Sequence, residues 1–113
     1  MNLYEKMYSA YDRLDTETYL ECFHEDYEMI RHSTGEKITL KDFHFDQLAT
    51  VMTGSKIKNR RCVYENEDIM IVHGIATYFN GSREAVMAVY LKKDGLVWRH
   101  ETGATPLKPQ EEH

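Results

Sequence analysis

The sequence predicts an α+β domain in which a curved, mainly antiparallel β-sheet wraps round three helices. The first half of the chain has apolar residues at helical spacing, whereas the second half contains strand-like runs separated by turns. The predicted order of elements is α-α-β-α-β-β-β-β. A chain of 113 residues has the length of one domain and can bury a core without metal ions or disulfides.

Two helices are predicted first. Apolar residues from Leu3 onward recur at helical spacing, which predicts an amphipathic helix over 2–13. A second, short helix follows, capped by Asp15 or Thr16 and ending near His24.

A short strand and a third helix are predicted next. The strand covers 27–32 and is closed by the turn-forming residues 33–35. Thr39 opens the third helix, which ends before Gly54 and has an apolar face formed by His44, Leu48, Val51 and Met52.

The rest of the domain is predicted to consist of strands over 56–64, 69–79, 83–92 and 96–103. The last three strands are separated by Asn80-Gly81 and Asp94-Gly95, dipeptides that favour two-residue type I′ turns. The domain is expected to span 1–104, with a flexible C-terminal tail over 105–113.

Two-residue turns fix the register and so assign each strand residue to one face of the sheet. They place Val72 opposite Val89, and Leu91 opposite Trp98, on the concave face that we expect to line a pocket. Both faces are apolar although three helices can cover only one, so a homodimer is predicted. Its interface is the second face, which carries Ile71, Ile75, Phe79, Val86, Ala88 and Tyr90.

Composition and targeting features exclude several classes of protein. The chain has 14 Lys+Arg against 19 Asp+Glu, and this net charge of -5 argues against a nucleic-acid partner. No segment has the apolar length of a membrane helix, and the N-terminus lacks the apolar run of a signal peptide, so we expect no membrane partner and a cytoplasmic location. The two cysteines are expected to be free thiols.

The sequence contains no pattern that is typical of a metal or cofactor site. No histidine has a second ligand at metal-binding spacing, and there is neither a glycine-rich phosphate loop nor a nucleophile triad. We therefore expect no metal and no cofactor. The one basic run, over 56–61, is interpreted as the solvated edge of the sheet.

The order of elements and two segments resemble the nuclear transport factor 2-like superfamily, specifically its SnoaL-like and ketosteroid-isomerase-like branch. Residues 15–26 resemble the family's second helix, which runs from an Asp into a Phe-x-x-Asp ending, and residues 90–103 are similar to its final hairpin. The resemblance implies a cystatin-like, cone-shaped sheet whose interior is a ligand pocket. It also implies a dimer through the outer sheet face.

The steroid isomerases of that branch use acids that this chain lacks. The resemblance places Arg31, followed by His32, where their catalytic Asp stands, and Val89 at or next to their second acid. Met7 matches their helix-one tyrosine, with Tyr8 one position away. Proton abstraction beside a carbonyl needs a base and a donor to the enolate oxygen, so steroid-type isomerisation is not expected.

Three side chains are candidates for acid–base catalysis: His100, His32 and Tyr78. An imidazole titrates near neutral pH, which suits proton transfer, although His100 could equally be a structural residue that lines the pocket. Arg31 could hold an anionic or carbonyl oxygen or form a salt bridge, and either Arg31 or His32 is expected to face the pocket. Tyrosines such as Tyr8 could donate to a ligand or pack in the core with a solvated hydroxyl.

The resemblance, together with these residues, implies that the ligand is a small apolar or carbonyl-bearing molecule. Three functions remain open: a cofactor-independent lyase, cyclase or isomerase, a non-catalytic binder, and a dimeric assembly module similar to the kinase association domain of the same superfamily. The residues expected to bind the ligand are Arg31, Val72, Met87, Val89, Leu91, Trp98, Thr102 and Tyr8.

Overall fold

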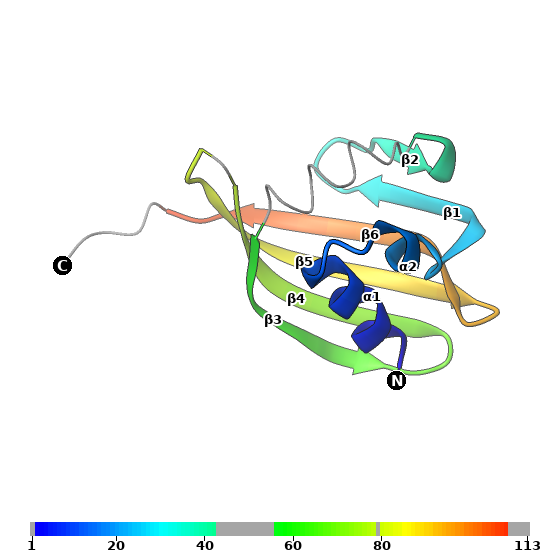
Figure 1. The fold of residues 1–113 in the computed structure, drawn as a ribbon. Helices are drawn as coiled ribbons and strands as arrows, with labels where there is room; N and C mark the ends of the chain where they lie inside the picture. The colour runs from blue at the N-terminus through cyan, green and yellow to red at the C-terminus, as the bar shows by residue number, and fades with distance from the viewer. Residues whose placement is uncertain (1, 43–55, 79, 109–113) are drawn as a thin grey trace.

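A computed structural model describes residues 2–42, 56–78 and 80–108 of the chain (Figure 1). Two α-helices come first, α1 (Leu3–Asp12) and α2 (Thr16–Leu20). They are followed by β1 (Phe23–Arg31), β2 (Lys37–Thr39), the 3-10 helix η1 (Leu40–Asp42), β3 (Lys56–Glu65), β4 (Ile69–Thr77), β5 (Arg83–Lys93) and β6 (Leu96–Pro106). Strand β1 starts earlier than predicted and β6 ends later, and β2 was not predicted.

The strands form one curved sheet in the order β2-β1-β6-β5-β4-β3. All neighbouring pairs are antiparallel except β1 and β6, which are parallel. The predicted curved, mainly antiparallel sheet is confirmed. The third helix predicted between Thr39 and Gly54 lies outside the described residues beyond Asp42, and its described beginning is the 3-10 helix η1.

Both α-helices lie on one face of the sheet (Figure 1). The side chains of Asn2 and Asp15 cap α1 and α2, each accepting a hydrogen bond from the backbone N–H three residues further on. The apolar side of α1 predicted from helical spacing faces the sheet, where the buried residues of this helix are Met7, Tyr8 and Ala10.

The turn between β4 and β5 is one residue longer than predicted. The backbone N–H of Tyr78 donates to the carbonyl of Ser82, and Gly81 has the positive φ (+83°) that closes a three-residue hairpin. Val72 therefore lies opposite Ala88, one position earlier than predicted. Because side chains alternate along a strand, this single residue moves every side chain of β5 to the other face.

The turn between β5 and β6 has the predicted type, but the register shifts just beyond it. Asp94 and Gly95 both have positive φ (55° and 79°), as a type I′ turn requires. A β-bulge at Trp98 then displaces the pairing by one residue. The displacement on β6 offsets the one on β5, so His100 and Thr102 lie on the concave face, as predicted.

The two shifts correct the predicted assignment of faces along β5. Val86, Ala88 and Tyr90, predicted on the outer face, lie on the concave face below the helices. Met87, Val89 and Leu91, predicted on the concave face, lie on the outer face, where Met87 is 42% exposed. Phe79, a further predicted member of the dimer interface, lies outside the described residues.

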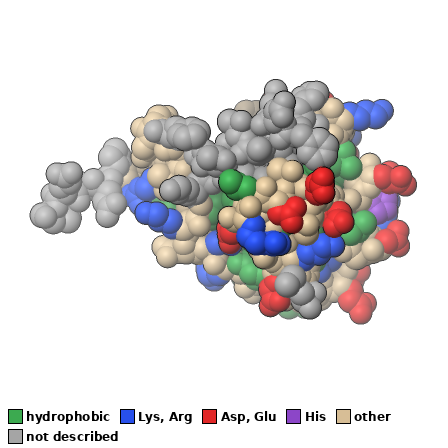
Figure 2. Space-filling view, in the orientation of Figure 1, with side chains coloured by type: hydrophobic (Ala, Val, Ile, Leu, Met, Phe, Trp, Pro, Cys, Tyr) green, Lys and Arg blue, Asp and Glu red, His purple; other side chains and the backbone are tan. Residues whose placement is uncertain are grey.

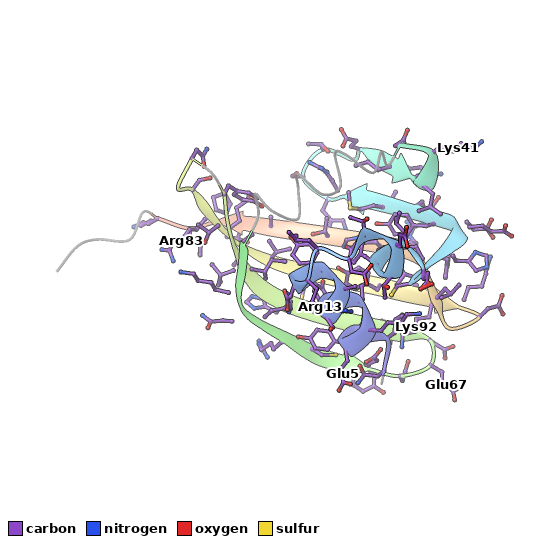
Figure 3. All side chains as sticks on the ribbon, in the orientation of Figure 1. Glu5, Arg13, Lys41, Glu67, Arg83 and Lys92 are labelled. Atoms are coloured by element: carbon purple, nitrogen blue, oxygen red, sulfur yellow. The ribbon has the colours of Figure 1, made fainter. Side chains whose placement is uncertain are left out.

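Aromatic rings fill much of the space between the helices and the sheet (Figure 3). Successive rings lie with their centroids 4.7 to 6.1 Å apart in the series Tyr4, Tyr8, Tyr11, Tyr19, Phe23 and Tyr27. Such contacts combine large apolar area with hydroxyl groups that need partners when buried. The core is therefore apolar at its rings and polar at a few defined oxygen atoms.

The face of the molecule seen in Figure 2 carries acidic and basic side chains that are interspersed rather than gathered by sign. None of the helices within the described ranges is long and apolar enough to span a membrane. Both cysteines, Cys22 and Cys62, are free thiols, as predicted.

Candidate functional site

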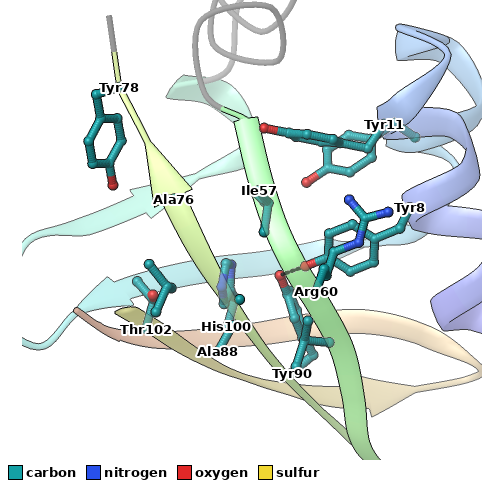
Figure 4. A pocket seen from close by; sticks show the side chains of 14 residues that line it. Tyr8, Tyr11, Ile57, Arg60, Ala76, Tyr78, Ala88, Tyr90, His100 and Thr102 are labelled. Atoms are coloured by element: carbon teal, nitrogen blue, oxygen red, sulfur yellow. Dashed lines mark hydrogen bonds between the residues drawn. The ribbon is translucent and has the colours of Figure 1, made fainter. Parts of the chain in front are cut away.

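A cavity of about 190 Å³ lies between the helices and the concave face of the sheet (Figure 4). Three small residues on neighbouring strands, Gly74, Ala76 and Ala88, leave the space that larger side chains would fill. Its wall is largely aromatic and includes Tyr8, Tyr11, Tyr19, Tyr78, Tyr90 and His100. The cavity is therefore suited to an apolar or planar molecule.

His100 extends from β6 into this wall. Its ring stacks on that of Tyr90, with centroids 4.2 Å apart, and its Nδ1 lies 3.1 Å from the hydroxyl of Tyr27. The Nε2 atom is buried and has no hydrogen-bond partner among the described residues. Burial lowers the pKa of His100 to about 3, so the ring is neutral at physiological pH.

The tautomer of His100 decides what its Nε2 atom can do. If the hydroxyl of Tyr27 donates to Nδ1, then Nε2 carries the proton and is a donor; in the opposite case Nε2 is an acceptor. Buried polar atoms in folded proteins nearly always have a partner. A ligand atom or a water molecule is thus the expected partner of Nε2 in either tautomer.

Tyr8 and Tyr90 form a second polar element of the cavity. Their hydroxyls are 2.7 Å apart, which joins α1 to β5 across the core (Figure 4). Burial raises the pKa of Tyr8 to about 12 and raises that of Tyr90 as well. Both phenols are therefore protonated at neutral pH, and only one of them can donate to the other.

Arg60 provides the one formal charge among the described residues that line the cavity. Its Nη1 and Nη2 donate to the two carboxylate oxygens of Asp12 at 3.0 and 2.6 Å, and its guanidinium lies 4.4 Å from the centroid of the Tyr8 ring. The Nε atom is buried and has no hydrogen-bond partner in the described part of the chain. Sequence reasoning missed this residue and interpreted its strand as a solvated edge.

A groove of about 520 Å³ adjoins the cavity and shares His100, Tyr78 and Thr102 with it. The hydroxyl of Tyr78 donates to Oε1 of Glu84 at 2.7 Å. Burial, together with this hydrogen bond, raises the pKa of Tyr78 to about 12. Arg31 and Glu84 also line the groove, so charges of both signs lie beside the cavity.

The structure brings together some of the predicted site residues. Those that line the cavity are His100, Tyr78, Val72, Thr102 and Tyr8, and Arg31 lines the adjoining groove. Their roles remain predictions. Val86, Ala88 and Tyr90 also line the cavity, although the predicted register had placed them outside.

Other predicted site residues lie elsewhere. Met87, Val89 and Leu91 point away from the cavity because the turn before β5 is longer than predicted. Trp98 is the unpaired residue of the β6 bulge, and Lys93 Nζ lies 5.3 Å from the centroid of the Trp98 ring. His32 is exposed, and its Nε2 lies 3.1 Å from Glu101 Oε1 beside an outer groove. Within the described ranges, no three His, Cys, Asp or Glu side chains gather in a way that could hold a metal ion.

No protein-family model and no curated protein sequence matches the chain. Its structure is similar to that of a candidate ketosteroid isomerase from Kribbella flavida, with a TM-score of 0.69 and 16% identity over 98% of this chain and 81% of the other. An NTF2-like protein of unknown function from Cytophaga hutchinsonii gives a TM-score of 0.68 and 14% identity, over 91% and 96% of the two chains. The protein TerC, co-crystallised with polyporic acid, gives 0.66 and 20% identity, over 88% and 86%.

With identities of 20% or less, these similarities define the fold of the chain. The chain has the nuclear transport factor 2-like fold, and the resemblance predicted from its element order and two segments is confirmed at that level. One fold can carry many functions, so the chemistry depends on the residues of the site itself.

Proposed function

We propose that this chain binds a small, largely apolar molecule with a carbonyl or hydroxyl group in the cavity between the helices and the sheet. The observation that supports this most is the buried Nε2 of His100, which has no partner in the described residues and belongs to a wall of tyrosine rings and mostly apolar small side chains. An oxygen of the ligand would supply the missing hydrogen bond, while the rings would contact its apolar part. The co-crystallisation of TerC with polyporic acid gives a precedent for a small organic ligand in a protein of this fold.

The proposal can be tested with the neutral fluorescent probe N-phenyl-1-naphthylamine. Its fluorescence should rise on binding to the wild type and should not rise with Ala88→Phe, because the new ring occupies the cavity. Ala85→Phe is the matched control, since Ala85 lies on the same strand but lines the outer groove. Loss of the signal with Ala85→Phe alone would place the binding site on the outer face and refute the proposal.

Catalysis of proton transfer is the second candidate function, and the Tyr78–Glu84 pair favours it. Glu84 is the carboxylate among the described residues of the groove, and Tyr78 connects it to the cavity. In such an enzyme Glu84 would remove a proton next to a carbonyl, and the neutral His100 would hold the carbonyl oxygen if Nε2 carries its proton. This role for His100 differs from the general base predicted from the sequence, because a pKa of about 3 makes the imidazole a weak base.

Exchange of the α-hydrogens of 2-tetralone in heavy water, followed by NMR, tests this second candidate. The wild type should accelerate the exchange, and Glu84→Gln should reduce the acceleration by roughly 10²- to 10⁴-fold, the usual contribution of a positioned base. The exposed Glu67→Gln is the control. Equal exchange rates with and without the protein would leave binding alone as the function.

We also propose that a second copy of the chain covers the outer face of the sheet. Both described α-helices lie on the concave side, so the apolar outer residues Ile71, Ile75 and Val89 are only half-buried. Stable dimers of this kind usually bury about 2,000 Å² or more. Light scattering at micromolar concentration should therefore give twice the mass of the chain, and a monomer would contradict the proposal.

A further inference from the structure

Arg60 is a largely buried cation that lines the cavity. Shielding a cation from water is costly unless a matching anion is shielded with it. The side chain of Arg60 is 16% exposed, whereas that of its ion-pair partner Asp12 is 56% exposed. The two charges therefore differ in surroundings: water screens the carboxylate, and the guanidinium borders the cavity. The local field inside the cavity is expected to be positive.

The guanidinium is also fixed in orientation. The two hydrogen bonds to Asp12 hold its outer nitrogens, and the ring of Tyr8 supports one face of the group. Five N–H donors are available on an arginine. Asp12 takes two of them, and of the other three the Nε–H donor is buried and has no partner within the described residues.

A preoriented, charged N–H group binds an ionised oxygen more strongly than a neutral one. The wall of the cavity includes five tyrosine rings, of which that of Tyr8 lies against Arg60, and such rings favour a flat partner over a branched one. The described residues of the cavity wall contain no carboxylate that would repel an anion, since Glu84 lies in the adjoining groove. The shape of the cavity and its charge thus both favour a flat, negatively charged ligand.

We propose that the ligand is a planar aromatic acid whose ionised oxygen accepts a hydrogen bond from Nε of Arg60. This inference rests on the proposed small-molecule function of the cavity and narrows it to one chemical class. Arg60 is then the residue that selects acids over neutral analogues, and Asp12 is a positioning residue that holds the guanidinium in place.

Calorimetric titration with 2-naphthoate and 2-naphthamide tests the inference, because the two probes share their rings and differ in charge. The wild type should bind the acid more tightly than the amide. In Arg60→Gln the preference for the acid should fall about tenfold or more, the effect of losing one charge-assisted hydrogen bond. Arg61→Gln is the matched control, since it removes the same charge from the next residue, which is exposed, and should keep the preference.

The outcomes separate this inference from the function on which it rests. If neither probe binds the wild type, the small-molecule function itself fails. If the amide binds as tightly as the acid, or if Arg61→Gln loses the preference as strongly as Arg60→Gln, the inference about Arg60 is overturned while the binding function stands. Should Arg60→Gln not fold, Arg60→Lys keeps the charge without the Nε donor at that place, and an unchanged preference there would overturn the inference.

Discussion

His100 is held by two tyrosines in a way that suppresses its charge. The stacked ring of Tyr90 and the hydroxyl of Tyr27 surround it with neutral groups, and burial is the cause of its low pKa. A protonated imidazole would carry a charge into this environment without a counter-ion. The physical role that fits best is that of a neutral hydrogen-bonding group at the end of an apolar cavity.

The low pKa of His100 predicts a pH dependence of stability. The unfolded chain takes up a proton near pH 6.5 and the folded chain only near pH 3, so the free energy of unfolding should fall as pH drops through this window. The slope contributed by His100 is at most about 1.4 kcal/mol per pH unit. Urea denaturation between about pH 5 and pH 6.5 measures this slope. Below about pH 4.5 a second group also changes the stability, because hydrogen bonding to Lys37 lowers the pKa of Glu28.

In His100→Gln this part of the pH dependence should disappear, although stability at neutral pH will also decrease. Equal slopes in the wild type and His100→Gln would show that the ring takes up a proton as readily in the folded protein as in the unfolded chain. The proposed role as a neutral group would then be wrong.

The hydroxyl pair of Tyr8 and Tyr90 supports a prediction about coupling. Either Tyr8→Phe or Tyr90→Phe leaves the other buried hydroxyl without this partner, which costs about 1–3 kcal/mol of unfolding free energy. The double variant removes both hydroxyls and should cost less than the sum of the two single variants. Denaturant unfolding of the four proteins measures the coupling, and strict additivity would mean that the hydroxyls do not interact.

At the scale of elements, the sequence predicts turns better than it predicts register. Asp94-Gly95 is a type I′ turn as expected, but Asn80-Gly81 belongs to a longer turn, since an Asn-Gly pair suits loops of two and three residues alike. The bulge at Trp98 has no sequence signal of its own. His100 was nevertheless placed on the correct face because two shifts of one residue cancel.

Uncertainty in strand register also explains why the sequence did not predict Arg60 as a residue of the site. Strict alternation along the basic run suggests a solvated edge strand. Asn59 has a φ of 54° within an irregular stretch of β3, and this bulge turns Arg60 toward the cavity while Lys58 and Arg61 stay exposed. A left-handed asparagine is compatible with the sequence but is not implied by it.

A substitution at Gly74 on β4 tests how closely strands β3 and β4 must approach each other at the cavity. A Cβ at this position would lie 2.5 Å from Cγ2 of Ile57 on β3, so Gly74→Ala should destabilise the protein by about 1–3 kcal/mol. Gly103→Ala is the control, because its Cβ would meet only His32 Nδ1 at 3.5 Å, an ordinary contact. Thermal unfolding of both variants measures the difference, and a Gly74→Ala protein as stable as the control would mean that β3 can move away at no cost.

At the scale of the whole molecule, the two faces of the sheet have different surroundings. The concave face is covered by helices and encloses the cavity, whereas the outer face exposes apolar side chains and an outer groove lined by His32, His73 and Met87. Apolar outer strands are unusual for an antiparallel sheet in contact with water. The observed register determines which residues of β5 would contact a second copy of the chain. Substitutions at neighbouring positions on β5 should therefore differ in their effect on dimer formation.

Glutamate substitutions at Met87 and Val86 separate the two faces. Met87→Glu places a charge on the outer face and should convert the proposed dimer to a monomer with an unchanged circular dichroism spectrum, because a dimer interface excludes unpaired charges. Val86→Glu puts the carboxylate at the wall of the cavity and should lower the melting temperature of the chain whatever its association state. Sedimentation velocity gives the mass of each variant. A dimer that survives Met87→Glu but is lost in a folded Val86→Glu protein would mean that the faces of β5 are reversed.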